Sequence, residues 1–174
     1  MYSVNTPLPP AVEALVAELQ PALAGYDRRE DPTLLVKRLD PEGRTAAGID
    51  PFPRLVERVR SALDGAPACE AKVTGVDAFA DPPAGPAPVV YLVVESPGLH
   101  ALHERLVDAF SAVHGIEGSG YTPHVTLGRG GDPAVARDLA ARDLEPVTWT
   151  VDEMVLYDAR HGEPVRRFPL PFTA

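Results

Sequence analysis

The stretch YTPHVTLGR, residues 121–129, decides the fold. Apolar and polar residues alternate over 124–127, which predicts a strand with one face in a hydrophobic core. Because side chains on a strand point to alternate faces, His124 and Thr126 are expected to share the other face. Arg129 follows closely. An imidazole, a hydroxyl and a guanidinium together suit a phosphate: they can move a proton, donate a hydrogen bond and supply positive charge.

The elements on either side of this strand repeat one order. Hydrophobic spacing and turn residues predict strands over 2–5, 33–39, 72–79, 88–95, 147–157 and 165–170, and helices over about 10–23, 55–63, 97–113 and 133–142. The order strand, helix, strand, helix, strand therefore occurs twice. It predicts an α+β fold of two similar lobes, each a small antiparallel sheet flanked by helices, around a central cleft. We expect residues 1–174 to form one domain, with both lobes contributing to the cleft.

Composition excludes several classes of protein. The formal net charge of −9 argues against an extended nucleic-acid surface, although it allows a local cationic pocket. No apolar run reaches the roughly 20 residues that a membrane span needs. The single cysteine, Cys69, and the absence of a signal-like start lead us to expect a cytoplasmic monomer without membrane contact.

With its surroundings, the HVTL motif of residues 124–127 resembles the second H-x-T-x motif of the 2H phosphoesterase superfamily, the group of 2′-5′ RNA ligases and RNA cyclic phosphodiesterases. The VVYLVV stretch at 89–94, the helix after it and the late strand resemble the family pattern too. The resemblance implies metal-independent chemistry on RNA ends or small cyclic nucleotides, with no cofactor. It also implies catalytic roles for His124 and Thr126 and a substrate-binding role for Arg129.

The first half departs from that pattern. The family places another H-x-T-x on the second strand, where this chain has Asp31, Pro32, Thr33 and Leu34. Read this way, Thr33 matches the motif threonine, and Asp31 stands in place of the histidine. A positioned general acid or base is typically worth ~10²–10⁴ in rate. Asp is a poor replacement because its ordinary pKa is near ~3.9.

Several candidate residues have two interpretations. Alternation places Lys37 on the face of Asp31 and Thr33, where it would bind phosphate; otherwise it is a solvent-facing strand residue. Asp31 either lines the cleft or pairs with a nearby arginine. Tyr121 either stacks on a base or packs at a strand edge.

Two further features carry little functional signal. His100 and His103 are expected on the solvent side of their helix, and no third ligand with suitable spacing suggests a metal. The GIEGSG stretch at 115–120 predicts a flexible loop. Two functions remain open: a phosphodiesterase or ligase of the 2H type, or a nucleotide- or RNA-end-binding protein that kept the cleft and lost turnover.

Overall fold

A computed structural model describes residues 2–39 and 51–171 of the chain, with the side chain of Pro51 outside the description. Its strands are β1 (Tyr2–Thr6), β2 (Asp27–Arg28), β3 (Leu34–Leu39), β4 (Cys69–Phe79), β5 (Val89–Glu95), β6 (His124–Arg129), β7 (Val147–Val151), β8 (Glu153–Asp158) and β9 (Glu163–Pro169). Its helices are α1 (Pro10–Leu19), α2 (Pro51–Leu63), α3 (Pro97–Phe110) and α4 (Pro133–Ala140), with short 3-10 turns at Gln20–Leu23 and Gly118–Gly120.

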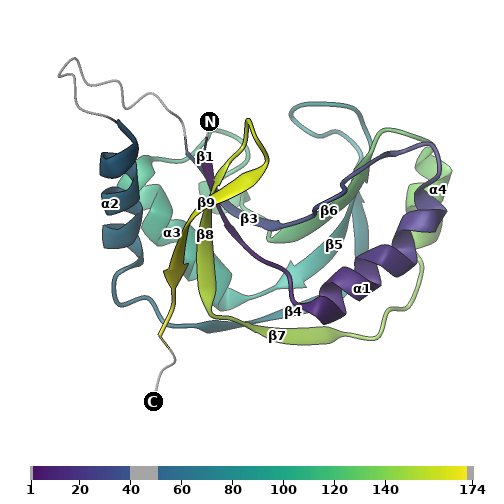
Figure 1. Cartoon of the computed structure of the whole chain (residues 1–174). Coiled ribbons are helices and arrows are strands. Elements are labelled where there is room, and N and C mark those ends of the chain that lie inside the picture. The colour runs from purple at the N-terminus through teal and green to yellow at the C-terminus, as the bar shows by residue number, and fades with distance from the viewer. Residues whose placement is uncertain (1, 40–50, 172–174) are drawn as a thin grey trace.

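The strands form one curled antiparallel sheet in the order β7-β4-β5-β6-β3-β1-β8-β9, with β2 paired to β6. This confirms the α+β class with antiparallel pairing. Two sets of four strands meet where β3 and β6 pair, and that pairing is a single residue pair, Leu34 with Val125. Helices α2 and α3 lie at one end of the molecule, and α1 and α4 at the other (Figure 1).

The two sets of strands do not follow the two halves of the chain. Strand β4 comes from the first half of the sequence but pairs with β5 and β7, whereas β8 pairs with the first strand, β1. The expected strand over 147–157 is therefore broken at Asp152: its first part pairs with β4 and its second with β1. The chain crosses from one half of the sheet to the other at that residue.

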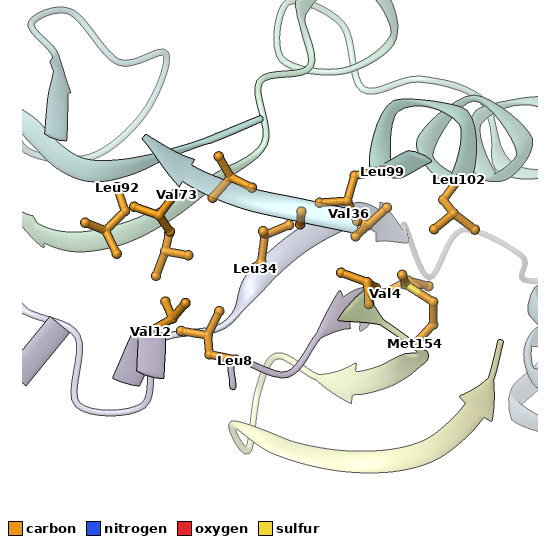
Figure 2. Close-up of a cluster of buried hydrophobic side chains, with 14 of the residues drawn as sticks. Val4, Leu8, Val12, Leu34, Val36, Val73, Leu92, Leu99, Leu102 and Met154 are labelled. Carbon is orange, nitrogen blue, oxygen red and sulfur yellow. The ribbon is translucent and has the colours of Figure 1, made fainter. Parts of the chain in front are cut away.

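Buried side chains from nearly every element fill the core. Figure 2 shows a cluster to which β1, α1, β3, β4, β5, α3 and β8 all contribute, with Val4, Leu34, Leu92, Leu99 and Met154 among its members. These five side chains have no exposed surface. Burying a side chain of this size stabilises a fold by about 1.5–3 kcal/mol. The two halves of the sheet therefore share one continuous core.

The helix ends follow from capping. The Ser96 hydroxyl accepts a hydrogen bond from the Leu99 N–H at the start of α3, and the Asp132 carboxylate accepts one from the Ala134 N–H at the start of α4. Both helices have proline at the first position, as the sequence predicts. Helix α3 stops at Phe110, three residues early, because Ser111 has a φ of 63° and leaves the helical conformation.

The expectation that His103 faces solvent is wrong. Its side chain is buried on the core side of α3, because it lies one turn from Leu99 and from Leu106. Its Nδ1 lies 2.7 Å from the Val36 carbonyl oxygen, and its Nε2 accepts a 2.8 Å hydrogen bond from the Gly118 N–H. Since a carbonyl only accepts, Nδ1 must carry the proton and the ring must be neutral.

No helix among the described residues combines the length and apolar character that a membrane crossing requires.

Candidate functional site

A polar cleft of about 590 Å³ opens along the junction of the two halves of the sheet. Strands β1, β2, β3, β6 and β8 and the turn after β8 contribute residues that line it. The residues that line it are Tyr2, Ser3, Asn5, Asp27, Arg28, Arg29, Glu30, Asp31, Thr33, Leu35, Arg38, His124, Thr126, Arg129, Tyr157, Ala159 and Gly162. Four of them are arginines, so the cleft can hold anions despite the acidic balance of the whole chain.

An apolar pocket of about 290 Å³ adjoins the cleft. Its walls include Phe79, Ile116 and Tyr121, together with prolines of the 80–88 segment. It shares four lining residues with the polar cleft: Leu35, Arg38, His124 and Arg129. A flat ring in this pocket would therefore lie next to the imidazole and both guanidinium groups.

Six of the seven site residues predicted from sequence line the cleft or the adjoining apolar pocket, and Lys37 lines neither. The cleft contains His124, Thr126, Thr33, Arg129 and Asp31, and the apolar pocket contains Tyr121. Asp31 is exposed and forms no ion pair with either neighbouring arginine within the described residues.

Both interpretations of Lys37 are wrong, because its side chain is 1% exposed and points away from the cleft. A β-bulge causes this. Strand β3 pairs Lys37 with Val4 and Leu35 with Asn5, so Val36 is an extra residue in the ladder. The bulge interrupts the alternation of faces: Lys37 shares the core face with Val4.

The same bulge brings Arg38 into the cleft, a residue that the sequence analysis missed. Arg38 pairs with Ser3, and both line the cleft. Strand β6 contains a matching bulge at Leu127, which places Arg129 on the same face as His124. Two strands thus use the same irregularity to direct an arginine at one cavity.

The two ladders agree residue by residue. Strand β1 pairs with β3 in the same register as β5 pairs with β6. Between β1 and β3 the pairs are Ser3↔Arg38, Val4↔Lys37, Asn5↔Leu35 and Thr6↔Leu34. Between β5 and β6 the corresponding pairs are Val89↔Arg129, Val90↔Gly128, Tyr91↔Thr126 and Leu92↔Val125. Superimposing the two registers aligns TLLVKR at 33–38 with HVTLGR at 124–129 without a gap. The shared final arginine is the sequence signal that could have identified Arg38.

This register corrects the reading of the first motif by two residues. Thr33, rather than Asp31, corresponds to His124, and Leu35 corresponds to Thr126. The Thr33 hydroxyl oxygen accepts a 2.6 Å hydrogen bond from the Asn5 side-chain amide. A hydroxyl can orient a water molecule or a substrate oxygen, but it does not titrate near neutral pH. The first half of the site therefore offers a hydrogen-bonding group where the second offers an imidazole.

His124 is arranged to present one basic nitrogen. Its Nδ1 lies 2.7 Å from the Thr122 carbonyl oxygen, so Nδ1 carries the proton. Nε2 has no hydrogen-bond partner within the described ranges. The ring packs edge-on against Phe79 and Tyr91, with centroid separations of 5.3 and 5.2 Å. Burial lowers the pKa of His124 and the nearby arginine charges lower it further, while the hydrogen bond to Thr122 acts in the opposite direction.

We therefore expect His124 to titrate below the ordinary histidine pKa of about 6.5. Replacing Arg38 or Arg129 with alanine removes a positive charge, so either variant should raise the His124 pKa. NMR titration of the imidazole C–H signals measures both effects. Arg167→Ala, on β9, is the control and should leave the pKa in place. A wild-type midpoint above 6.5, or arginine variants that lower it, would contradict this electrostatic account.

The site combines a neutral imidazole with two guanidinium groups and a hydroxyl. These groups can bind a phosphate and take a proton from a water molecule or a hydroxyl beside it. No group of three or more metal-ligating side chains occurs in the described part of the chain.

Known proteins resemble this chain in sequence pattern and in fold. The sequence model of the family described as the 2′-5′ RNA ligase superfamily matches residues 7–163. No curated protein matches the chain.

Among solved structures, TT0787 of Thermus thermophilus has 19% identity, with 99% of each chain covered and a TM-score of 0.68. E. coli LigT complexed with 3′-AMP has 17% identity, 97% coverage of each chain and a TM-score of 0.64. E. coli LigT complexed with NADP+ has 18% identity, 98% and 96% coverage, and a TM-score of 0.61. At these identities the solved structures show a shared fold.

Proposed function

Because the chain belongs to the 2′-5′ RNA ligase superfamily, we propose that it binds a nucleotide or an RNA end in the cleft and slowly hydrolyses a 2′,3′-cyclic phosphodiester there. The observation that carries the proposal is the convergence of His124, Arg38 and Arg129 on one cavity. The apolar pocket beside them has the size and walls to hold a base. The LigT structures with 3′-AMP and NADP+ show that a relative of this fold binds nucleotides.

The proposed reaction needs no metal. The two guanidinium groups bind non-bridging phosphate oxygens, and the Thr126 hydroxyl donates a further hydrogen bond. His124 Nε2 removes a proton from a water molecule as the water oxygen bonds to phosphorus. The bond from phosphorus to one ribose oxygen breaks, and that oxygen takes its proton from solvent. The last transfer is slow because no second imidazole stands at Thr33.

A second function has its own supporting observation. With Thr33 at the position that corresponds to His124, the site lacks one of two titratable groups. Losing a general acid costs ~10²–10⁴ in rate, or about 3–5 kcal/mol. A protein with that deficit can serve as a nucleotide- or RNA-end-binding protein without useful turnover.

Turnover of 2′,3′-cyclic nucleotides, and of a short RNA ending in a cyclic phosphate, tests the proposal. The assay contains EDTA, and we compare the wild-type protein with His124→Ala. The matched control is His161→Ala, which removes an exposed histidine paired with Asp158. We expect product from the wild type and the control, and background from His124→Ala.

Three other results of this assay would contradict the proposed hydrolysis by His124. Equal product from His124→Ala and the wild type would mean that another group is the base. Binding of 3′-AMP without any product would favour the binding protein. Neither binding nor product, from a folded protein, would overturn both functions.

A further inference from the structure

We propose that Glu117, in the loop between α3 and β6, is a positioning residue that holds Arg38 in the cleft. It acts with Lys37 and His103, and we call these three residues the buried clamp. The inference rests on the proposed function insofar as Arg38 is taken to bind a phosphate. The sequence predicts a flexible loop here, but Glu117 is 6% exposed and its carboxylate is fully engaged.

Glu117 joins the loop to the strand. Its Oε2 lies 2.6 Å from Lys37 Nζ and accepts a 2.8 Å hydrogen bond from the Val113 N–H. Its Oε1 accepts a 2.8 Å hydrogen bond from the Arg38 N–H. Lys37 Nζ also donates a 2.5 Å hydrogen bond to the Arg38 carbonyl oxygen. Both backbone polar groups of Arg38 are thus held by one buried ion pair.

This arrangement replaces a missing strand. The edge of β3 that faces β6 is paired only at Leu34, so the following backbone groups lack a sheet partner on that side. Side chains bind these backbone groups instead. The Tyr121 hydroxyl donates a 3.1 Å hydrogen bond to the Leu35 carbonyl oxygen, and His103 Nδ1 donates one to the Val36 carbonyl oxygen. The Glu117 carboxylate accepts one from the Arg38 N–H. Buried backbone groups need such partners, because leaving one unpaired costs about 1–3 kcal/mol.

The consequence for the site follows from the bulge. Arg38 faces the cleft only because Val36 is an extra residue, which the ladder leaves without a partner on β1. The clamp contacts the backbone at this extra residue and beyond it: His103 at the Val36 carbonyl oxygen, and Glu117 and Lys37 at the N–H and the carbonyl oxygen of Arg38. Without it, β3 can return to simple alternation, which would exchange the faces of Lys37 and Arg38. The clamp therefore sets which basic side chain meets the phosphate.

Binding of 3′-AMP measures the effect, with adenosine as the phosphate-free probe. The first variant combines Lys37→Met with Glu117→Leu, since an apolar replacement of a buried ion pair can preserve the fold. We expect it to weaken 3′-AMP binding by about 10- to 100-fold, the value of one charge-assisted contact, and to leave adenosine binding unchanged. The conservative variant, Lys37→Met with Glu117→Gln, keeps an acceptor for the Arg38 N–H and should recover most of the affinity. Glu57→Gln removes an exposed ion pair with Arg60 and serves as the surface control.

A double-mutant cycle separates positioning from general damage. In an Arg38→Ala background, adding Lys37→Met and Glu117→Leu should cause no further loss, because residues that act through one contact are not additive. An equal loss in both backgrounds, or no loss in either, would overturn the proposal. Should that variant not fold, Glu117→Asp enters the same cycle, since its shorter carboxylate keeps the charge but falls short of the Arg38 N–H.

Failure of the proposed function gives a different result. A wild-type protein that binds neither 3′-AMP nor inorganic phosphate would refute the phosphate site itself. A crystal structure of the variant with Lys37→Met and Glu117→Leu then tests whether the clamp positions Arg38. Loss of the bulge at Val36, or a changed direction of Arg38, would support the clamp, and an unchanged Arg38 would overturn it.

Discussion

Thr33→His is expected to raise turnover of a 2′,3′-cyclic nucleotide by ~10²–10⁴, the usual contribution of a positioned general acid or base. The matched registers of β1–β3 and β5–β6 put residue 33 where the other half of the site has His124. A histidine there would protonate the leaving oxygen while His124 accepts the proton of water. The rate should become bell-shaped in pH, because one histidine must be protonated and the other neutral.

Asp31→His is the matched control, because it places the same side chain two residues earlier, where the uncorrected alignment puts the motif histidine. We expect no gain from it. Leu35→Thr combined with Thr33→His restores the full motif and should add a smaller increment. A gain from Asp31→His alone, measured with both variants folded, would show that the ladder correspondence does not describe the chemistry.

Lys37→Ala is expected to lower the free energy of unfolding by about 3–5 kcal/mol, the usual cost of removing one partner from a buried pair. The reason is the carboxylate of Glu117, which would remain buried without its ammonium partner. Urea denaturation at neutral pH measures the change. Adding Glu117→Gln to Lys37→Ala should restore part of the stability, since no buried charge then remains.

Arg60→Ala is the control for that experiment. It breaks an ion pair with Glu57 whose side chains are 49% and 64% exposed, and exposed pairs are worth about 0–1 kcal/mol. Similar losses from Lys37→Ala and Arg60→Ala would contradict this prediction and mean that Glu117 finds another partner in the variant.

Periodicity is enough to predict most elements and the second half of the site. The HVTL motif, the apolar run at 89–94 and the capped starts of α3 and α4 each have a local physical cause that can be read from neighbouring residues. His124 and Thr126 share a face as alternation along one strand predicts, whereas Arg129 reaches the same cleft only because Leu127 is an extra residue in the pairing of β5 and β6.

The errors share one cause, which is that nonlocal contacts decide what local patterns leave open. Alternation along TLLVKR directs Lys37 to the cleft, and nothing within those six residues marks Val36 as extra, because a bulge is set by pairing. A stripe of three leucines assigns His103 to the wrong face of α3, since the loop that hydrogen-bonds its ring lies 15 residues further along the chain. Only the comparison of two distant segments, 33–38 and 124–129, would have revealed Arg38.

The crossing of β4 into the far half of the sheet has a consequence for synthesis. Tyr2 pairs with Asp158, so the first strand gains its second neighbour only after residue 158 has left the ribosome. A nascent chain that ends in the 80–88 segment carries β1 and β3, which pair with each other, but their outer partners β8 and β6 and both partners of β4 are still missing. Such a chain exposes unpaired strand edges, which favour association with other chains. High contact order of this kind also slows folding, so the cleft arises only once β8 has been made.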